Sequence, residues 1–321
     1  MPANPNSSFR NHPLWLWPHL LSLEAPIVAV AWTLGLARLH HVPVMPGVLS
    51  GLGLCVWIVY VLDRLLDGLF TRVEPLDVRH EFHKRWWKVL LVALACGAAV
   101  TSWLALNVVP AALMWECLGL GVLMLLYLAV YASGGSRWYH HLMIPASSLG
   151  ALVVVHSMPL PPGFQLMVTL LILGVLCLVF FRRLRMLVTS PLAKDVVGGM
   201  LFALGCTAWT RFVQADGDVQ SSAVELFLPA CLFISNLTGI STRAAQGRWL
   251  AMGFGLVAGV CALAATGRMA SSLGVLAQAC GIGLILLLVL DWKRKPLSPE
   301  AYRVWADLAV LAPVVYLWIR A

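Results

Sequence analysis

The stretch "GVLSGLGLCVWIVYVLDRLLD", residues 47–67, decides the fold class of this chain. It is a run of about fifteen apolar residues that ends in two aspartates four positions apart, Asp63 and Asp67. A helix needs ~20 predominantly apolar residues to cross the hydrocarbon core of a bilayer. The run and its flanking residues meet that length, so we predict a membrane-spanning helix whose charged end lies near one surface of the membrane.

Similar apolar runs recur along the whole chain. The 321 residues are 60% hydrophobic and 11% charged, with a mean hydropathy of +0.86, whereas soluble domains carry about 25% charged residues. The alternation of a membrane β-barrel is absent from the sequence. The eight cysteines lie singly in apolar segments, which favours small buried side chains over disulfides or a zinc site. The composition therefore predicts an all-α, polytopic membrane bundle.

The apolar runs predict a polar N-terminal segment, residues 1–17, followed by one transmembrane helical domain, residues 18–321. No cleavable signal peptide is expected, because the first apolar run is long enough to remain as a helix. The predicted helices cover residues 18–38, 47–66, 88–107, 111–132, 142–158, 165–182, 192–212, 224–242, 249–267, 272–291 and 303–319. The segment 142–158 is among the shortest of these predicted helices. The sequence does not decide whether it spans the membrane.

The lysines and arginines are distributed unevenly between the two sides of this predicted topology. Eighteen of the 22 fall on the side that holds the N-terminus and the loop after the second helix. The other four are Arg38, Arg211, Arg268 and Arg320. Cytoplasmic loops are enriched in Lys and Arg, so we expect a cytoplasmic N-terminus and a periplasmic C-terminus. This distribution accounts for the net charge of +8 without a nucleic-acid partner.

Asp63 and Asp67 lie one helical turn apart, so their carboxylates share a helix face. Two like charges at this spacing repel each other unless a positive group lies between them. One candidate is Mg²⁺, which takes carboxylate oxygens and often shares them with substrate phosphates. The other is an ordinary interfacial ion pair with Arg64, Arg72 or Arg79, and the spacing alone does not decide between the two.

The motif "YVLDRLLDG" resembles a shortened first aspartate motif of the UbiA superfamily of intramembrane prenyltransferases. That motif reads N-D-x-x-D-x-x-x-D, and Asp63 and Asp67 match its last two aspartates. Its leading Asn-Asp pair falls on Val59 and Tyr60. The ordered segments "SLEAPIVAVAWTLGLAR", "LDRLLD" with "RHEFHKRWW", "PLAKDVVGGMLFALG", "FISNLTGI" and "RVWADLAVLAPVVYLWI" are similar to a bacterial UbiA-like group and span nearly the whole chain.

The second aspartate motif of the superfamily, N-x-x-x-D-x-x-x-D, is incomplete in this chain. Asn236 matches its leading asparagine, but Ile240 and Ala244 occupy the positions of the aspartates. The superfamily usually has nine helices, and a helical hairpin inserted within residues 112–182 would bring the count to eleven without changing the side of either motif.

The resemblance implies a UbiA-like bundle in the bacterial inner membrane that transfers a polyprenyl group from its diphosphate to an unknown acceptor. It implies Asp63 and Asp67 as the catalytic, magnesium-binding residues. Nearby polar residues would bind the substrate, namely Arg64, Arg72, Lys194, Asn236 and Arg243. The alternative is a non-catalytic relative that binds or carries an isoprenoid lipid. The missing aspartates of the second motif favour this alternative. The partners expected in either case are an isoprenoid lipid and membrane lipids.

The segment "HEFH" places His80 and His83 three positions apart, a possible metal pair on one helix face. It lacks the spacing of the H-E-x-x-H zinc motif. A basic, aromatic segment suits the headgroup layer of a membrane. We therefore expect both histidines at the interface.

Overall fold

The computed structural model describes residues 16–70, 78–131, 190–214, 219–241, 271–294 and 297–320, together with isolated positions between 145 and 176 and at 255. Its regular elements in these ranges are all helices, so the prediction of an all-α bundle is confirmed. They are α1 (Trp17–Leu20), α2 (Glu24–Leu39), α3 (Pro46–Phe70), α4 (Val78–Arg85), α5 (Trp87–Asn107), α6 (Ala111–Tyr131), α10 (Pro191–Val213), α11 (Val219–Ile240), α13 (Ser272–Trp292) and α14 (Pro299–Arg320). The predicted helices at 142–158, 165–182 and 249–267 lie outside the described ranges.

Six helices within the described residues are long and apolar enough to cross a membrane. They are Pro46–Asp67, Glu81–Asn107, Ala111–Tyr131, Pro191–Val213, Ser272–Trp292 and Pro299–Arg320. Large apolar side chains on their outer faces are exposed, among them Val92, Leu106, Ile285 and Ile319. Such a surface would be unfavourable in water but suits contact with lipid tails. The chain is therefore a polytopic membrane protein.

Several helices begin at a serine followed by residues that favour a helical first turn. Ser190 precedes Pro191 at the start of α10, and its side chain accepts a hydrogen bond from the backbone N–H of Ala193. Ser271 caps α13 in the same way, and Ser298 accepts from Ala301 N at the start of α14. A capping oxygen satisfies one of the free N–H groups that every helix start exposes. These residues fix where α10, α13 and α14 enter the bundle.

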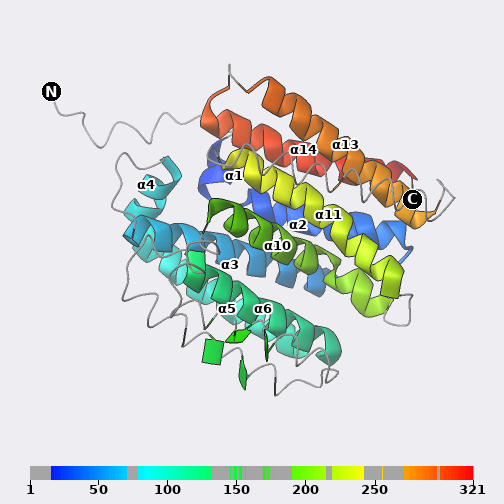
Figure 1. Ribbon diagram of the computed structural model, residues 1–321. Coiled ribbons are helices and arrows are strands. Elements are labelled where there is room, and N and C mark those ends of the chain that lie inside the picture. The colour runs from blue at the N-terminus through cyan, green and yellow to red at the C-terminus, as the bar shows by residue number, and fades with distance from the viewer. Residues whose placement is uncertain are drawn as a thin grey trace.

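The helices lie roughly parallel or antiparallel and share two ends (Figure 1). We call the end that holds the starts of α2, α10 and α14 and the last turns of α3 and α11 the first end. The opposite end, which holds the last residues of α2 and α14, is the second end. The short helices α1 and α4 also lie at the first end, on the left in Figure 1. Charged side chains from separate helices meet at each of these ends.

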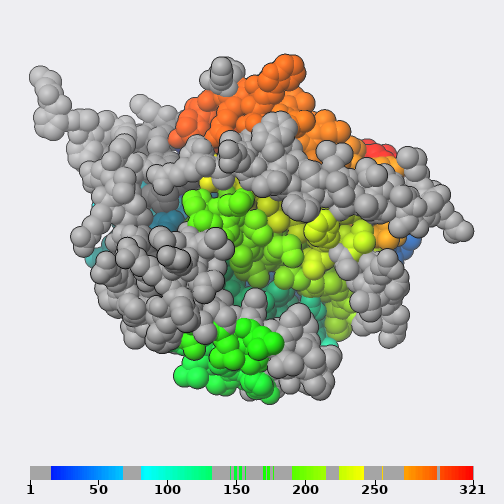
Figure 2. All heavy atoms as spheres, in the orientation of Figure 1, coloured from blue at the N-terminus to red at the C-terminus, as the bar shows by residue number. Residues whose placement is uncertain are grey.

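The core is centred on α2, which packs against α3, α10 and α14. Its Trp32 is fully buried, donates a hydrogen bond from Nε1 to the carbonyl of Val310 at 3.0 Å, and meets the ring of Phe233 edge to face. The side chains of α10 and α11 adjoin on one face of the molecule (Figure 2). α11 also packs against α13. This packing holds α2, α3, α10, α11 and α14 in one bundle.

α10 and α11 approach each other closely at Gly199. A Cβ atom at this position would lie 2.6 Å from Cγ1 and 2.7 Å from the backbone N of Ile234. Small residues at helix contacts let membrane helices approach one another closely. Glycine at this point therefore sets the spacing between the two helices that carry Lys194 and Asn236.

The first predicted helix, residues 18–38, is wrong as a continuous element. The chain forms the single turn α1, breaks at residues 21–23, and resumes as α2 at Glu24. Ser22 adopts a left-handed backbone conformation, with φ of 59°, which a continuous right-handed helix excludes. Ser22 is also a point of contact for side chains from α3 and α4, so tertiary contacts stabilise a break that the apolar pattern does not indicate.

Candidate functional site

The first end of the bundle brings together the two elements of the sequence hypothesis, an aspartate of α3 and a lysine of α10. Lys194 Nζ lies 4.0 Å from Asp63 Oδ1, and both side chains are about one-third exposed or less. This separation is longer than a hydrogen bond, and Asp63 Oδ1 is enclosed without a hydrogen-bond partner. Asp67 lies one turn further along α3, near its C-terminal end. The first end therefore combines two carboxylates of one helix with a lysine of another.

Arg64 lies beside Asp63 in the sequence but is 8% exposed. Its Nη1 donates to the carbonyl oxygen of His19 and to Oγ of Ser22, each at 2.7 Å. These bonds connect α3 to the α1–α2 break. A guanidinium held in this way is a structural tie between elements, which argues against Arg64 as a ligand for substrate phosphate.

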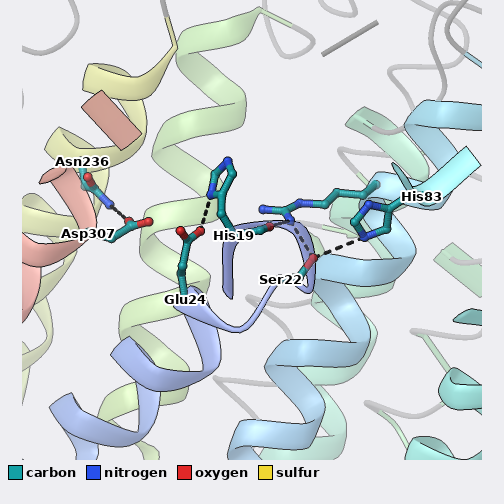
Figure 3. Close-up of polar contacts among 7 residues, drawn as sticks. His19, Ser22, Glu24, His83, Asn236 and Asp307 are labelled. Atoms are coloured by element: carbon teal, nitrogen blue, oxygen red, sulfur yellow. Dashed lines mark hydrogen bonds and ion pairs between the residues drawn. The ribbon is translucent and has the colours of Figure 1, made fainter. Parts of the chain in front are cut away.

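His19 and Ser22 extend this buried polar group to α2 and α4 (Figure 3). His19 Nδ1 lies 2.6 Å from Oε2 of Glu24, and Ser22 Oγ lies 3.4 Å from Nε2 of His83. His83 is fully buried, because α4 packs over the α1–α2 break at the first end. Its place at the membrane interface stays a prediction. The side chain of His80 lies outside the described residues.

A small pocket lies inside the bundle, near Asp63. Tyr60, Asn236 and Asp307 contribute its polar lining. Tyr60 precedes Asp63 by one turn of α3, and it lies within electrostatic range of Asp63, Arg64 and Asp307. Asn236 donates from Nδ2 to Oδ1 of Asp307 at 3.1 Å, which joins α11 to α14 (Figure 3). The pocket therefore places polar groups from three helices next to the predicted aspartate site.

The remaining predicted site residues have different outcomes. Asn236 lies at the first end, but its amide contacts Asp307, a carboxylate that the sequence hypothesis did not include. Arg72 and Arg243 lie outside the described residues, so their predicted roles stay predictions. Ile240, at the position of a second-motif aspartate, packs against the apolar core. That position contributes no charge to the first end.

The carboxylates of α3 fit a bound Mg²⁺ in their chemistry. Mg²⁺ is commonly held by one or two carboxylates, with waters and substrate phosphates completing its coordination. Asp63 supplies an enclosed oxygen that no protein donor satisfies, and Asp67 lies on the same helix face. Among the described residues, His, Cys, Asp and Glu side chains form no group of three or more that could hold a metal ion.

Sequence reasoning missed Tyr60 and Asp307. Tyr60 belongs to the motif itself, and its spacing of three residues from Asp63 places it on the same side of α3. Asp307 is an acid near an apolar run of the last helix, and acids inside membrane segments are often functional. That signal was available in the sequence, but the pairing of Asp307 with Asn236 required the packing of α14 against α11.

The second end has contacts between ionisable side chains of its own. Arg211 of α10 forms an ion pair with Glu116 of α6. His40, at the end of α2, has Nε2 3.2 Å from Oε1 of Glu225 on α11, and both side chains are less than one-tenth exposed. These contacts join neighbouring helices far from Asp63.

Comparison with protein-family models, with curated proteins and with solved structures finds no match to this chain.

Proposed function

We propose that the chain is a UbiA-like intramembrane prenyltransferase, which transfers a polyprenyl group from its diphosphate to an acceptor at the first end of the bundle. The observation that carries the proposal is the meeting of Asp63 and Lys194 at 4.0 Å, across α3 and α10, with an enclosed oxygen of Asp63 lacking a donor. A metal–diphosphate ligand calls for both kinds of group, carboxylate for the metal and ammonium for the phosphate.

The chain's own residues would orient the diphosphate. Lys194 lies in the first turn of α10, where the helix dipole adds to its positive charge and attracts an anion. Asp63 and Asp67 would hold Mg²⁺, which supplies charge neutralisation to a departing diphosphate when it is bound. The prenyl C1–O bond breaks with its electron pair on the diphosphate, and the acceptor forms the new bond to C1 and loses a proton.

A second candidate function is a non-catalytic protein that binds or carries an isoprenoid lipid. The observation that favours it is Ile240, which packs on the core at the position where a second aspartate would be needed. A diphosphate at the first end would then be held by one pair of carboxylates instead of two. A carrier would bind the isoprenoid chain without depending on Asp63 or on magnesium.

The location that accompanies the proposal is the bacterial inner membrane, with the first end facing the cytoplasm. The positive-inside distribution supports this orientation, because the loops that leave the first end carry most of the lysines and arginines. The N-terminus would then be cytoplasmic and the C-terminus periplasmic. Soluble, anionic prenyl donors of the cytoplasm would reach the site directly.

The test is a titration of farnesyl diphosphate against the full chain in lipid nanodiscs, with and without Mg²⁺. We expect magnesium-dependent binding by the wild type and a loss of about 10- to 100-fold in affinity for Asp63→Asn and for Asp67→Asn, because each removes a charged ligand. Asp291→Asn is the matched control, since Asp291, in the last turn of α13, pairs with Arg294 just after that helix. Equal binding by the wild type and both site variants, in either condition, contradicts the metal site.

Farnesol in place of the diphosphate distinguishes the carrier. Binding of farnesol as tight as that of the diphosphate, unchanged in both variants, supports the carrier and excludes the transferase. The same titration on sealed vesicles tests the orientation, because a diphosphate does not cross a bilayer. Binding to inside-out vesicles and not to right-side-out vesicles is expected, and the reverse result places the first end outside.

A further inference from the structure

The junction between α4 and α5 carries positive charge at one margin of a membrane-spanning helix. Lys84, Arg85 and Lys88 fall within five residues, and all three are exposed. From residue 81 to residue 107 the sequence has one acid, Glu81, and no other lysine or arginine. Helix α5 has 21 residues and is therefore about 32 Å long, close to the ~30 Å of a bilayer's hydrocarbon core. The three cations at its start then lie beside the lipid head groups.

The opposite face of α4 packs against the bundle, which fixes the direction of the charged face. Phe82 is 6% exposed and belongs to an apolar cluster with Leu16 and Leu20 at α1. His83 is fully buried, with Nε2 3.4 Å from Oγ of Ser22. The basic residues that follow these two in the sequence are therefore presented on the outer face of a helix that is held in place.

Two exposed tryptophans lie between the cations. Trp86 and Trp87 are 46% and 41% exposed, and Lys88 Nζ lies 5.6 Å from the centroid of the Trp87 ring. The ring centroid of Phe82 lies 6.5 Å from that of Trp86 and 6.5 Å from that of the exposed Trp17. Tryptophan rings favour the boundary between lipid tails and head groups. The junction therefore offers cations to a lipid phosphate and indole rings to the glycerol region below it.

The two lysines keep their positive charge available to a ligand. In the part of the chain that the structure describes, no ion pair includes Lys84 or Lys88. The end of α13 provides a contrast, because Lys293 is exposed beside the exposed Trp292 but follows the carboxylate of Asp291 by two positions. An anion should therefore be attracted more strongly to the α4–α5 junction than to the end of α13.

We propose that the α4–α5 junction binds the head group of an anionic phospholipid, with the phosphate at Lys84 and Lys88 and the glycerol region against Trp86 and Trp87. Basic residues directly outside a membrane helix attract anionic lipids, and the fixed outer face of α4 makes this attraction local. A zwitterionic head group carries its own ammonium, which offsets its phosphate, so it should bind more weakly. The inference concerns lipid binding alone, and it does not depend on prenyl transfer.

The test places the full chain in phosphatidylcholine nanodiscs that contain one of two photoreactive probes. The probes are a phosphatidylglycerol and a phosphatidylcholine with the same diazirine-bearing acyl chain. After irradiation, mass spectrometry of proteolytic peptides gives the ratio of phosphatidylglycerol to phosphatidylcholine labelling at residues 82–91 and at residues 286–293. We expect a ratio about tenfold or more higher at the junction, because each basic residue near the surface strengthens the attraction to an anionic lipid about fivefold.

Two double variants change the lysines alone. Lys84→Gln/Lys88→Gln should lower the ratio at the junction to about that at the end of α13, because one exposed basic residue then remains at each place. Lys84→Arg/Lys88→Arg keeps both charges and should keep the wild-type ratio. Lys293→Gln is the matched control, since it removes an exposed lysine beside a tryptophan and should leave the ratio at the junction unchanged.

Equal ratios at the two places in the wild type overturn the proposal, and this comparison requires no variant. So does a junction ratio that Lys84→Gln/Lys88→Gln leaves unchanged at wild-type thermal stability, or one that Lys84→Arg/Lys88→Arg abolishes. An excess of glycerol 1-phosphate at matched ionic strength should leave the labelling in place. If it removes the labelling, the junction is a site for a soluble phosphate and the proposal fails.

Discussion

Ionisable side chains from separate helices meet at both ends of the bundle, but their contacts differ between the two ends. At the second end, Arg211 contacts Glu116 directly, and His40 lies 3.2 Å from Glu225. At the first end, the ion pair of Asp63 with Lys194 spans 4.0 Å. Enclosed oxygens of Asp63 and Asn236 have no hydrogen-bond partner. His40 Nε2 also lacks hydrogen-bond geometry, although it lies within ion-pair distance of Glu225.

We use this difference to distinguish charged side chains that hold helices together from charged side chains that a ligand would contact. A buried charge is tolerated when a partner lies in contact with it, and an unmet polar group is unfavourable unless something else satisfies it. The direct contact of Arg211 with Glu116 at the second end indicates a structural role. The incomplete pairing at the first end is what the proposed ligand would complete.

Of the three changes below, forcing α10 and α11 apart should lower the free energy of unfolding most. Gly199→Ala places a Cβ 2.7 Å from the backbone N of Ile234, so α10 must move away from α11. We expect a loss of about 3 kcal/mol in the free energy of unfolding, at the upper end of the range for overpacking, measured by SDS-induced unfolding in mixed micelles. The movement should also weaken farnesyl diphosphate binding, because Lys194 and Asn236 lie on the two separated helices.

Gly205→Ala is the matched control for this variant. It lies on the same helix, and its nearest neighbour would be Leu52 Cδ1 at 3.9 Å, an ordinary contact distance. The control should unfold at the wild-type SDS concentration or slightly above it, because alanine favours a helix over glycine. Equal destabilisation by both variants would show that the contact at Gly199 is not the cause.

Breaking the pair of His40 and Glu225 at the second end should lower the free energy of unfolding by an intermediate amount. His40→Leu leaves the Glu225 carboxylate, whose side chain is 9% exposed, without the imidazole beside it. An enclosed polar group that loses its partner costs about 1–3 kcal/mol, so the free energy of unfolding should fall by this amount. The double variant His40→Leu/Glu225→Leu should recover most of the loss. If the double variant is as unstable as His40→Leu, the contact between His40 and Glu225 does not stabilise the fold.

The smallest effect on stability is expected at the first end. Asp63→Asn removes one partner of a partly exposed ion pair of 4.0 Å, which contributes less than about 1 kcal/mol. Its free energy of unfolding should stay close to that of the wild type, although its affinity for farnesyl diphosphate should fall by about 10- to 100-fold. A destabilisation as large as that of His40→Leu would remove the distinction between the two ends and would make Asp63 a structural residue.

The helices were predictable where an apolar run is long and its ends carry clear signals. The ranges 88–107, 111–132 and 272–291 agree with α5, α6 and α13 to within one residue at each end. The apolar run near the N-terminus gave the wrong result, because the break at Ser22 depends on Arg64 and His83. Neither residue is near Ser22 in the sequence.

The sequence by itself determined the membrane class, most helix ranges and the presence of two carboxylates on one face of α3, because hydrophobic length and helical periodicity are local properties. Only the tertiary structure decided which charges meet. Lys194 lies 4.0 Å from Asp63, Arg64 turns to the α1–α2 break, and Asp307 accepts a hydrogen bond from Asn236, 71 residues away in the sequence. These contacts follow from which helices pack side by side, and the sequence pattern of each helix does not specify its neighbours.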